Sequence, residues 1–136
     1  MSSLAACRIG SRPGHVLAVS VAAARELGEE TGLGRVVTHG LVVDQVAANP
    51  DTGAPEGVNV VCDGGTMSAA DAEALSLPIE AMDEIEALAW IRPDDLHAFA
   101  LPFMERRIRA AVAAALVGYR FPLLYNGEPA EQPTAA

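Results

Sequence analysis

The sequence predicts a small α/β domain, because two helical patterns flank segments that are rich in β-branched residues. Apolar side chains recur at helical spacing within residues 15–31 and again within residues 102–117. Between them, residues 36–46 and 57–63 read as two strands, and the Asn-, Pro- and Gly-containing stretch 47–56 reads as the hairpin loop that joins them. A chain of 136 residues has the length of one domain.

The first helix has two alternative starts, one near His15 and one at Ser20, which could serve as its N-cap. Gly32 is expected to end the helix, because glycine readily adopts the left-handed conformation that follows the last turn. The spacing predicts a buried stripe made of Leu17, Val21, Ala24 and Leu27.

The remaining predicted elements are short. A strand within residues 4–9 precedes a turn at 10–14, and Ser68 resembles the cap of a brief helix. Residues 85–91 are predicted to form a strand that carries Trp90 into the core. A last short strand or extended arm at 121–125 is followed by an Asn126-Gly127 turn.

The composition excludes some partners. The net charge of −9 argues against binding to a nucleic-acid backbone or to an anionic membrane. Cys7 and Cys62 show neither metal-site spacing nor a disulfide pattern, and no apolar run reaches the length of a membrane span, so we expect a cytoplasmic protein. All nine basic residues are arginine and alanine is abundant, a composition typical of a GC-rich bacterial genome.

Three carboxylates mark the first helix as the candidate site. Glu26, Glu29 and Glu30 are spaced i, i+3 and i+4, so they share one face of the helix. Like charges at this spacing repel one another, and oxygen ligands are those that Mg²⁺ prefers. The pattern therefore predicts either a solvated acidic helix end or a divalent-cation site.

The run Arg25-Glu26-Leu27-Gly28-Glu29-Glu30-Thr31-Gly32-Leu33 resembles the second half of the Nudix box. The first half of the box does not match, since Ser11 and Leu17 occupy the positions of its Gly and its Glu. The resemblance implies a Nudix-like α/β/α sandwich with a mixed sheet over residues 14–125, whose N-terminal strands are missing or shortened. Residues 1–13 would be a short N-terminal segment, and residues 126–136 a disordered tail.

The same resemblance implies a metal-dependent pyrophosphohydrolase that cleaves a nucleoside diphosphate linked to another moiety. Glu26, Glu29 and Glu30 would bind Mg²⁺ or Mn²⁺. Glu29 would be a metal ligand or the general base, and Glu30 would be a catalytic residue as well as a ligand. Arg25 would orient an acid, and Gly32 would be structural. The alternative is a catalytically weak Nudix-like domain that binds a nucleotide or a protein.

Other residues are weaker candidates. A fourth carboxylate could come from Glu80, Asp83 or Glu84, and Arg35 is the cation best placed to meet a substrate phosphate. The three histidines, His15, His39 and His97, share no ligand spacing. Because few residues precede the box, we expect a homodimer or a partner that completes the sheet.

Overall fold

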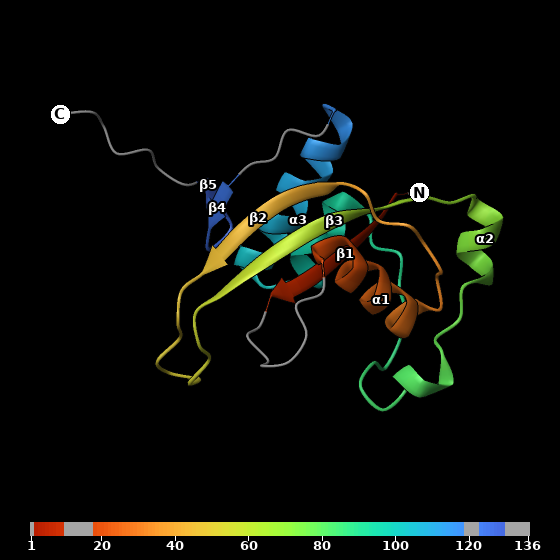
Figure 1. Ribbon diagram of the computed structural model, residues 1–136, viewed down its shortest axis with the longest axis horizontal. Coiled ribbons are helices and arrows are strands. Elements are labelled where there is room, and N and C mark those ends of the chain that lie inside the picture. Colours follow the sequence, from red (N-terminus) through yellow and green to blue (C-terminus); the bar gives the residue numbers. More distant parts are fainter. Residues whose placement is uncertain (1, 10–17, 119–122, 130–136) are drawn as a thin grey trace.

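The structure is a computed structural model that describes residues 2–9, 18–118 and 123–129 (Figure 1). Its five strands are β1 (Ser2–Ile9), β2 (Gly40–Val46), β3 (Gly57–Thr66), β4 (Leu123–Tyr125) and β5 (Glu128–Pro129). The α-helices are α1 (Val19–Thr31), α2 (Ala69–Ala74) and α3 (Pro102–Leu116). Two 3₁₀ helices, η1 (Ile79–Ala81) and η2 (Pro93–Ala98), lie between α2 and α3 along the chain.

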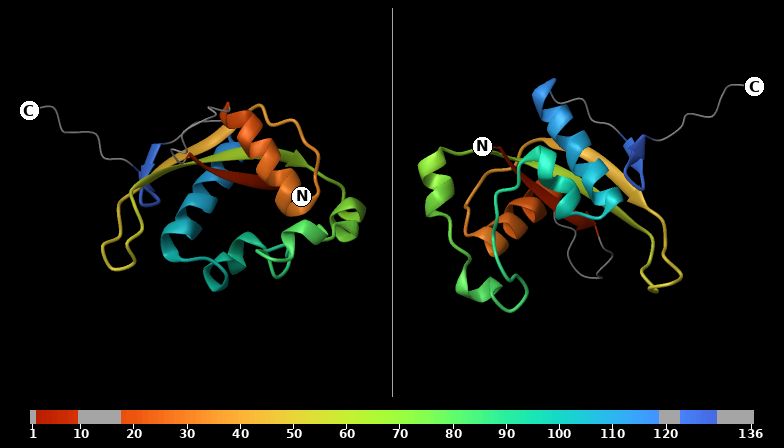
Figure 2. Two further views of the ribbon diagram at one scale, coloured as in Figure 1. Left: turned by 60° about the horizontal axis from the view of Figure 1, so that its bottom comes forward. Right: turned by 180° about the vertical axis from the view of Figure 1, so that it is seen from behind.

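The sheet is mixed, with strand order β1-β3-β2-β4-β5. Strand β3 pairs antiparallel with both β1 and β2, whereas β4 runs parallel to β2 and antiparallel to β5. Helix α1 covers one face of this sheet and α3 the other, as the left view of Figure 2 shows. The predicted α/β class is therefore confirmed.

Both faces of the central strands are buried. On the α1 side, Val60 and Cys62 of β3 pack with Ala23 of α1. On the α3 side, Val61 packs with Ala111 of α3. This alternation follows from the period of two residues along a strand, so that helices cover both faces of β3.

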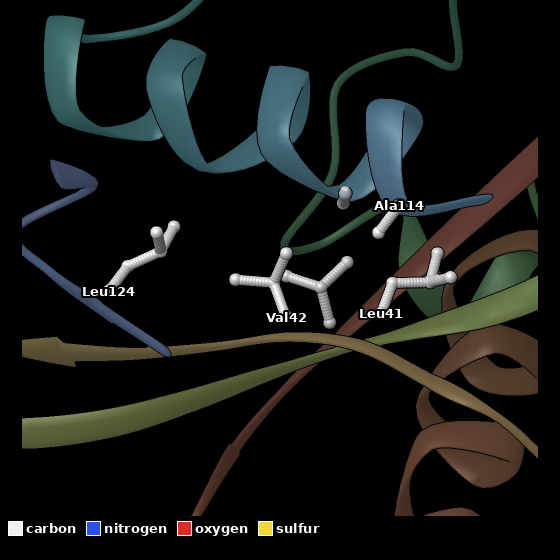
Figure 3. Packing of buried hydrophobic residues seen from close by; sticks show 6 residues of the cluster. Leu41, Val42, Ala114 and Leu124 are labelled. Atoms are coloured by element: carbon white, nitrogen blue, oxygen red, sulfur yellow. The ribbon is translucent and has the colours of Figure 1, made fainter. Parts of the chain in front are cut away.

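A register shift between Gly40 and Val42 modifies the alternation in β2. It allows two successive residues, Leu41 and Val42, to belong to the same cluster under α3. Figure 3 shows both side chains pointing from the sheet toward α3, where Ala114 and Leu124 complete the contact.

The helix ends follow local chemistry. Gly32 adopts φ +73° as the C-cap of α1, and its N–H donates to the carbonyl of Gly28 at 2.9 Å, as predicted. Ser68 caps α2 by accepting from the backbone N–H of Asp71. Pro102 opens α3, a position where a proline loses no helical hydrogen bond.

The first helix differs from its prediction in two respects. Its N-cap is Ala18 rather than Ser20, with no side-chain hydrogen bond at the cap. Val21 is 53% exposed, and Ala23 and Leu27 are the buried residues of the helix. Because these two are spaced i and i+4, the buried stripe is rotated from the predicted one. Leu17 and His15 lie outside the described residues.

The predicted strand at 36–46 begins only at Gly40, since residues 36–39 form an extended loop in which Val37 is buried. Strand β3 continues through Gly64 and Gly65 to Thr66, whereas the sequence placed its end at Asp63. Gly65 has φ +83°, a backbone conformation that glycine accepts without a steric penalty.

The strand predicted at 85–91 is wrong. Its first amide, from Ile85, donates to the carbonyl of Ala81 at 2.8 Å, so the segment opens in a turn rather than along a neighbouring strand. Trp90 is 41% exposed and is not a core residue. Its indole N–H donates to the carbonyl of Ala72 at 3.1 Å and ties the loop to α2.

Both ends of the described chain belong to the sheet. Strand β1 pairs along β3, so the expected N-terminal segment supplies an edge strand. Residues 126–129, which we assigned to a tail, form a turn and strand β5; residues 10–14 and 130–136 lie outside the described part. The expected homodimer or sheet-completing partner stays a prediction. Within the described ranges, no helix has both the length and the apolar composition needed to cross a membrane.

Candidate functional site

The three predicted carboxylates lie on the last turns of α1. Leu27, which is 5% exposed, anchors this part of the helix in the core. Glu29 and Glu30 are exposed, while Glu26 is half-buried. The helix therefore turns one apolar side toward the sheet and presents its carboxylates away from it, as the spacing predicts.

Arg25 neutralises part of this face. Its Nη2 donates to Oε1 of Glu26 at 2.8 Å, and its Nε lies 3.7 Å from Oε1 of Glu29. The second contact joins two residues that are one helical turn apart. Since the side chain of Arg25 is 52% exposed, these contacts position the carboxylates more than they stabilise the fold.

An open cleft of about 670 Å³ runs between α1 and the segment 78–85, which contains η1. Figure 1 shows this segment beside the C-terminal end of α1. Helix α1 lines the cleft with Ala24, Arg25, Glu26, Gly28, Glu29 and Glu30. The opposite wall consists of Pro78, Glu80, Ala81, Glu84 and Ile85.

The cleft thus brings together carboxylates from two separate parts of the chain. Glu80 and Glu84, two of the three candidates for a fourth acid, line it, whereas Asp83 does not. Five carboxylates and one guanidinium surround the same space. Any anionic ligand that enters would need cations to screen it.

The acidic surroundings of the cleft change the pKa of Glu30. Partial burial raises the pKa of its carboxyl above the ordinary value, because burial disfavours the charged form. The negative charges of Glu26 and Glu29 on the same helix raise the pKa further. Glu84 adds to the shift from across the cleft, which shows that the two acidic walls interact.

The donor set suits a hard divalent cation, since every anionic side chain in the cleft offers carboxylate oxygens. As placed, however, no group of three or more His, Cys, Asp or Glu side chains in the described residues is arranged to hold a metal ion. Two of the candidate ligands, Glu26 and Glu29, are instead turned toward Arg25. Cation binding would therefore require carboxylate rotamers to change.

The other predicted residues lie elsewhere. Arg35 is half-buried and does not line the cleft. His39 makes a 2.8 Å contact with the hydroxyl of Thr38, and His97 makes a 2.9 Å contact with the carbonyl of Asp94. Neither histidine lines the cleft. Gly32 has the structural role assigned to it, as the C-cap of α1.

The apolar part of the opposite wall was missed by the sequence reasoning. Pro78 and Ala81 carried no functional signal, and Ile85 was placed in a strand. In the sequence, this wall is a proline followed by small and apolar residues that alternate with acidic ones. Such a pattern is too common to indicate a binding surface.

Comparison of the chain with known protein families, with curated proteins and with solved structures gives no match.

Proposed function

We propose that this chain is a divalent-cation-dependent pyrophosphohydrolase of the Nudix type, acting on a nucleoside diphosphate linked to another moiety. The observation that carries the proposal is the placement of Glu26, Glu29 and Glu30 in one cleft. These are the acids of the half box, and they face further carboxylates across that cleft. A solvated acidic helix end has no need of a second acidic wall.

Glu26 and Glu30 would hold Mg²⁺ or Mn²⁺ on the α1 side, and Glu29 would serve as a further ligand or as the general base. When bound, the cation supplies screening of the diphosphate and a lowered pKa of the attacking water. Arg25 acts as a positioning residue, because its ion pairs restrain the carboxylates of Glu26 and Glu29. Glu84 is the better placed candidate for the fourth acid, since its charge already acts on Glu30.

A catalytically weak domain that binds a nucleotide or a protein is the second candidate. Two observations favour it: Ser11 and Leu17 replace the Gly and the Glu of the first half of the box, and the carboxylates are not arranged for a cation as they stand.

The test is phosphate release from a panel of dinucleoside and sugar nucleotides, with Mg²⁺, with Mn²⁺ and with a chelator. Glu30→Gln keeps the shape of the side chain but removes an anionic ligand. We expect it to lower both kcat/KM and Mg²⁺ affinity, measured by calorimetry, by about tenfold or more. Glu73→Gln on α2 is the matched control, because Glu73 is exposed and does not line the cleft.

Equal Mg²⁺ affinity in the native chain and in the Glu30→Gln variant would rule out this cation site. Binding of a nucleotide that depends on Mg²⁺ but leads to no turnover would favour the second candidate.

A further inference from the structure

The wall of the cleft that faces α1 carries apolar as well as acidic groups. Pro78, Ala81 and Ile85 line it together with two carboxylates. This wall is held by local contacts, since the carbonyl of Ala81 accepts from the amides of Glu84 at 3.1 Å and Ile85 at 2.8 Å. Ala81 itself is only 8% exposed.

The wall also has a fixed place relative to α1. A Cβ built on Gly32, the C-cap of that helix, would lie 3.6 Å from Cγ of Pro78, an ordinary van der Waals distance. Pro78 therefore lies against the end of the helix that carries the carboxylates. A ligand with its phosphates near Glu29 and Glu30 would have its organic group within reach of this wall.

The side chains that line the cleft offer a nucleobase no aromatic ring to stack on. Among the described residues that line it, none is aromatic, and none carries a neutral amide or hydroxyl group. Stacking on a ring and hydrogen bonding to base edges are the two ways in which proteins hold a base. The hydrogen-bonding side chains of the cleft are carboxylates and one guanidinium, which is paired with Glu26 and Glu29. Small aliphatic groups form the rest of the wall that faces α1.

We propose that the cleft binds a diphosphate ester in which the organic group inside the cleft is a short aliphatic chain. This chain would pack against Pro78, Ala81 and Ile85. This inference rests on the proposed function, because it assumes that the diphosphate lies at the carboxylates of α1. A nucleoside on the other side of the diphosphate would lie outside the cleft. The competing substituent is a hydroxylated, sugar-like group, whose hydroxyls could donate to Glu80 and Glu84.

The experiment is calorimetry of methyl, ethyl, propyl and butyl diphosphate at saturating Mg²⁺. Burying one methylene group raises affinity by about fourfold, so we expect the affinity to rise by about that factor at each step. Ile85→Asn should remove most of this rise while leaving methyl diphosphate binding within about twofold. Ile79→Asn is the matched control, because Ile79 is a neighbouring isoleucine that is 79% exposed and does not line the cleft.

The proposal would be overturned by affinity that is flat along the series, by a rise that survives Ile85→Asn, or by tighter binding of 2,3-dihydroxypropyl diphosphate than of propyl diphosphate. Absence of any binding would overturn it as well. A rise in affinity without hydrolysis of any compound would leave this inference standing and would defeat only the proposed catalytic function.

Discussion

Asp44 on β2 and Arg107 on α3 form a buried ion pair, in which Nε of the guanidinium donates to Oδ2 of the carboxylate at 2.6 Å. Asp44 is fully buried and Arg107 is 8% exposed. The second carboxylate oxygen accepts from the amide of Gly127 at 2.9 Å. One carboxylate thus joins the central sheet, the helix above it and the C-terminal turn.

Asp44→Asn should destabilise the fold by about 3–5 kcal/mol, because it leaves the guanidinium of Arg107 buried without a counter-charge. An amide also has only one oxygen, so either Arg107 or Gly127 would face an NH₂ group. The measurement is urea denaturation. Glu105→Gln is the control, since it breaks an i,i+4 pair with Arg109 at the surface and should cost about 0.3–0.5 kcal/mol. Equal costs in the two variants would contradict the structural role of the buried pair.

Gly127→Ala should destabilise the protein more than Gly53→Ala does. Both glycines have positive φ, +79° and +71°, so both variants lose about 1–2 kcal/mol to backbone strain. A Cβ on Gly127 would also come within 2.5 Å of the carbonyl oxygen of Phe103, whereas a Cβ on Gly53 meets nothing within 4 Å. Overpacking of this kind costs about 1–3 kcal/mol in addition to the backbone strain. Thermal unfolding of both variants compares the two costs directly, and equal values would show that α3 and the turn do not approach so closely.

Glu30→Gln should stabilise the metal-free protein at neutral pH. The pKa of Glu30 is raised above its ordinary value of 4.5, first by burial and then by Glu26, Glu29 and Glu84. The folded state therefore binds the proton more tightly than the unfolded state, so stability is lost as pH rises from about 4.5 through the folded-state pKa. The glutamine variant lacks this loss.

The measurement is denaturation in the presence of a chelator from pH 4 to pH 7. The free energy of unfolding of the variant should rise relative to that of the native chain as pH rises. Glu73→Gln, at an exposed residue outside the cleft, is the control. Added Mg²⁺ should reverse the order by stabilising the native chain selectively. A glutamine variant that is less stable than the native chain at pH 7 without metal would show that the carboxylate already has a favourable partner.

Local chemistry explains why much of the fold was predictable. The spacing of Leu27 and the acids predicted a helix in this segment, and Gly32 predicted where the helix ends. Both signals are local, because they depend on helical period and on capping. The hairpin of β2 and β3 and the helix that starts at Pro102 follow from similar signals.

What failed depends on contacts between distant segments. Residues 85–91 have the apolar content of a strand, but the amide of Ile85 is already used by Ala81. Asp44 stands between Val43 and Gln45, where the sequence gives no sign that its carboxylate is buried, and only the approach of Arg107 makes this burial tolerable. The acidic face of α1 was predictable, whereas the wall that turns this face into one side of a cleft comes from a segment some fifty residues away, as the lining residues show.

The bond from Gly127 to Asp44 spans 83 positions in the chain. A ribosome that adds about 5–20 residues per second needs about 4–17 s to cover that distance. For the first 63 of these positions, until Arg107 has been added, the carboxylate on β2 has no counter-charge and cannot enter the core without cost. The domain should therefore remain loosely packed during synthesis, and should reach its final density only when the turn at Gly127 emerges.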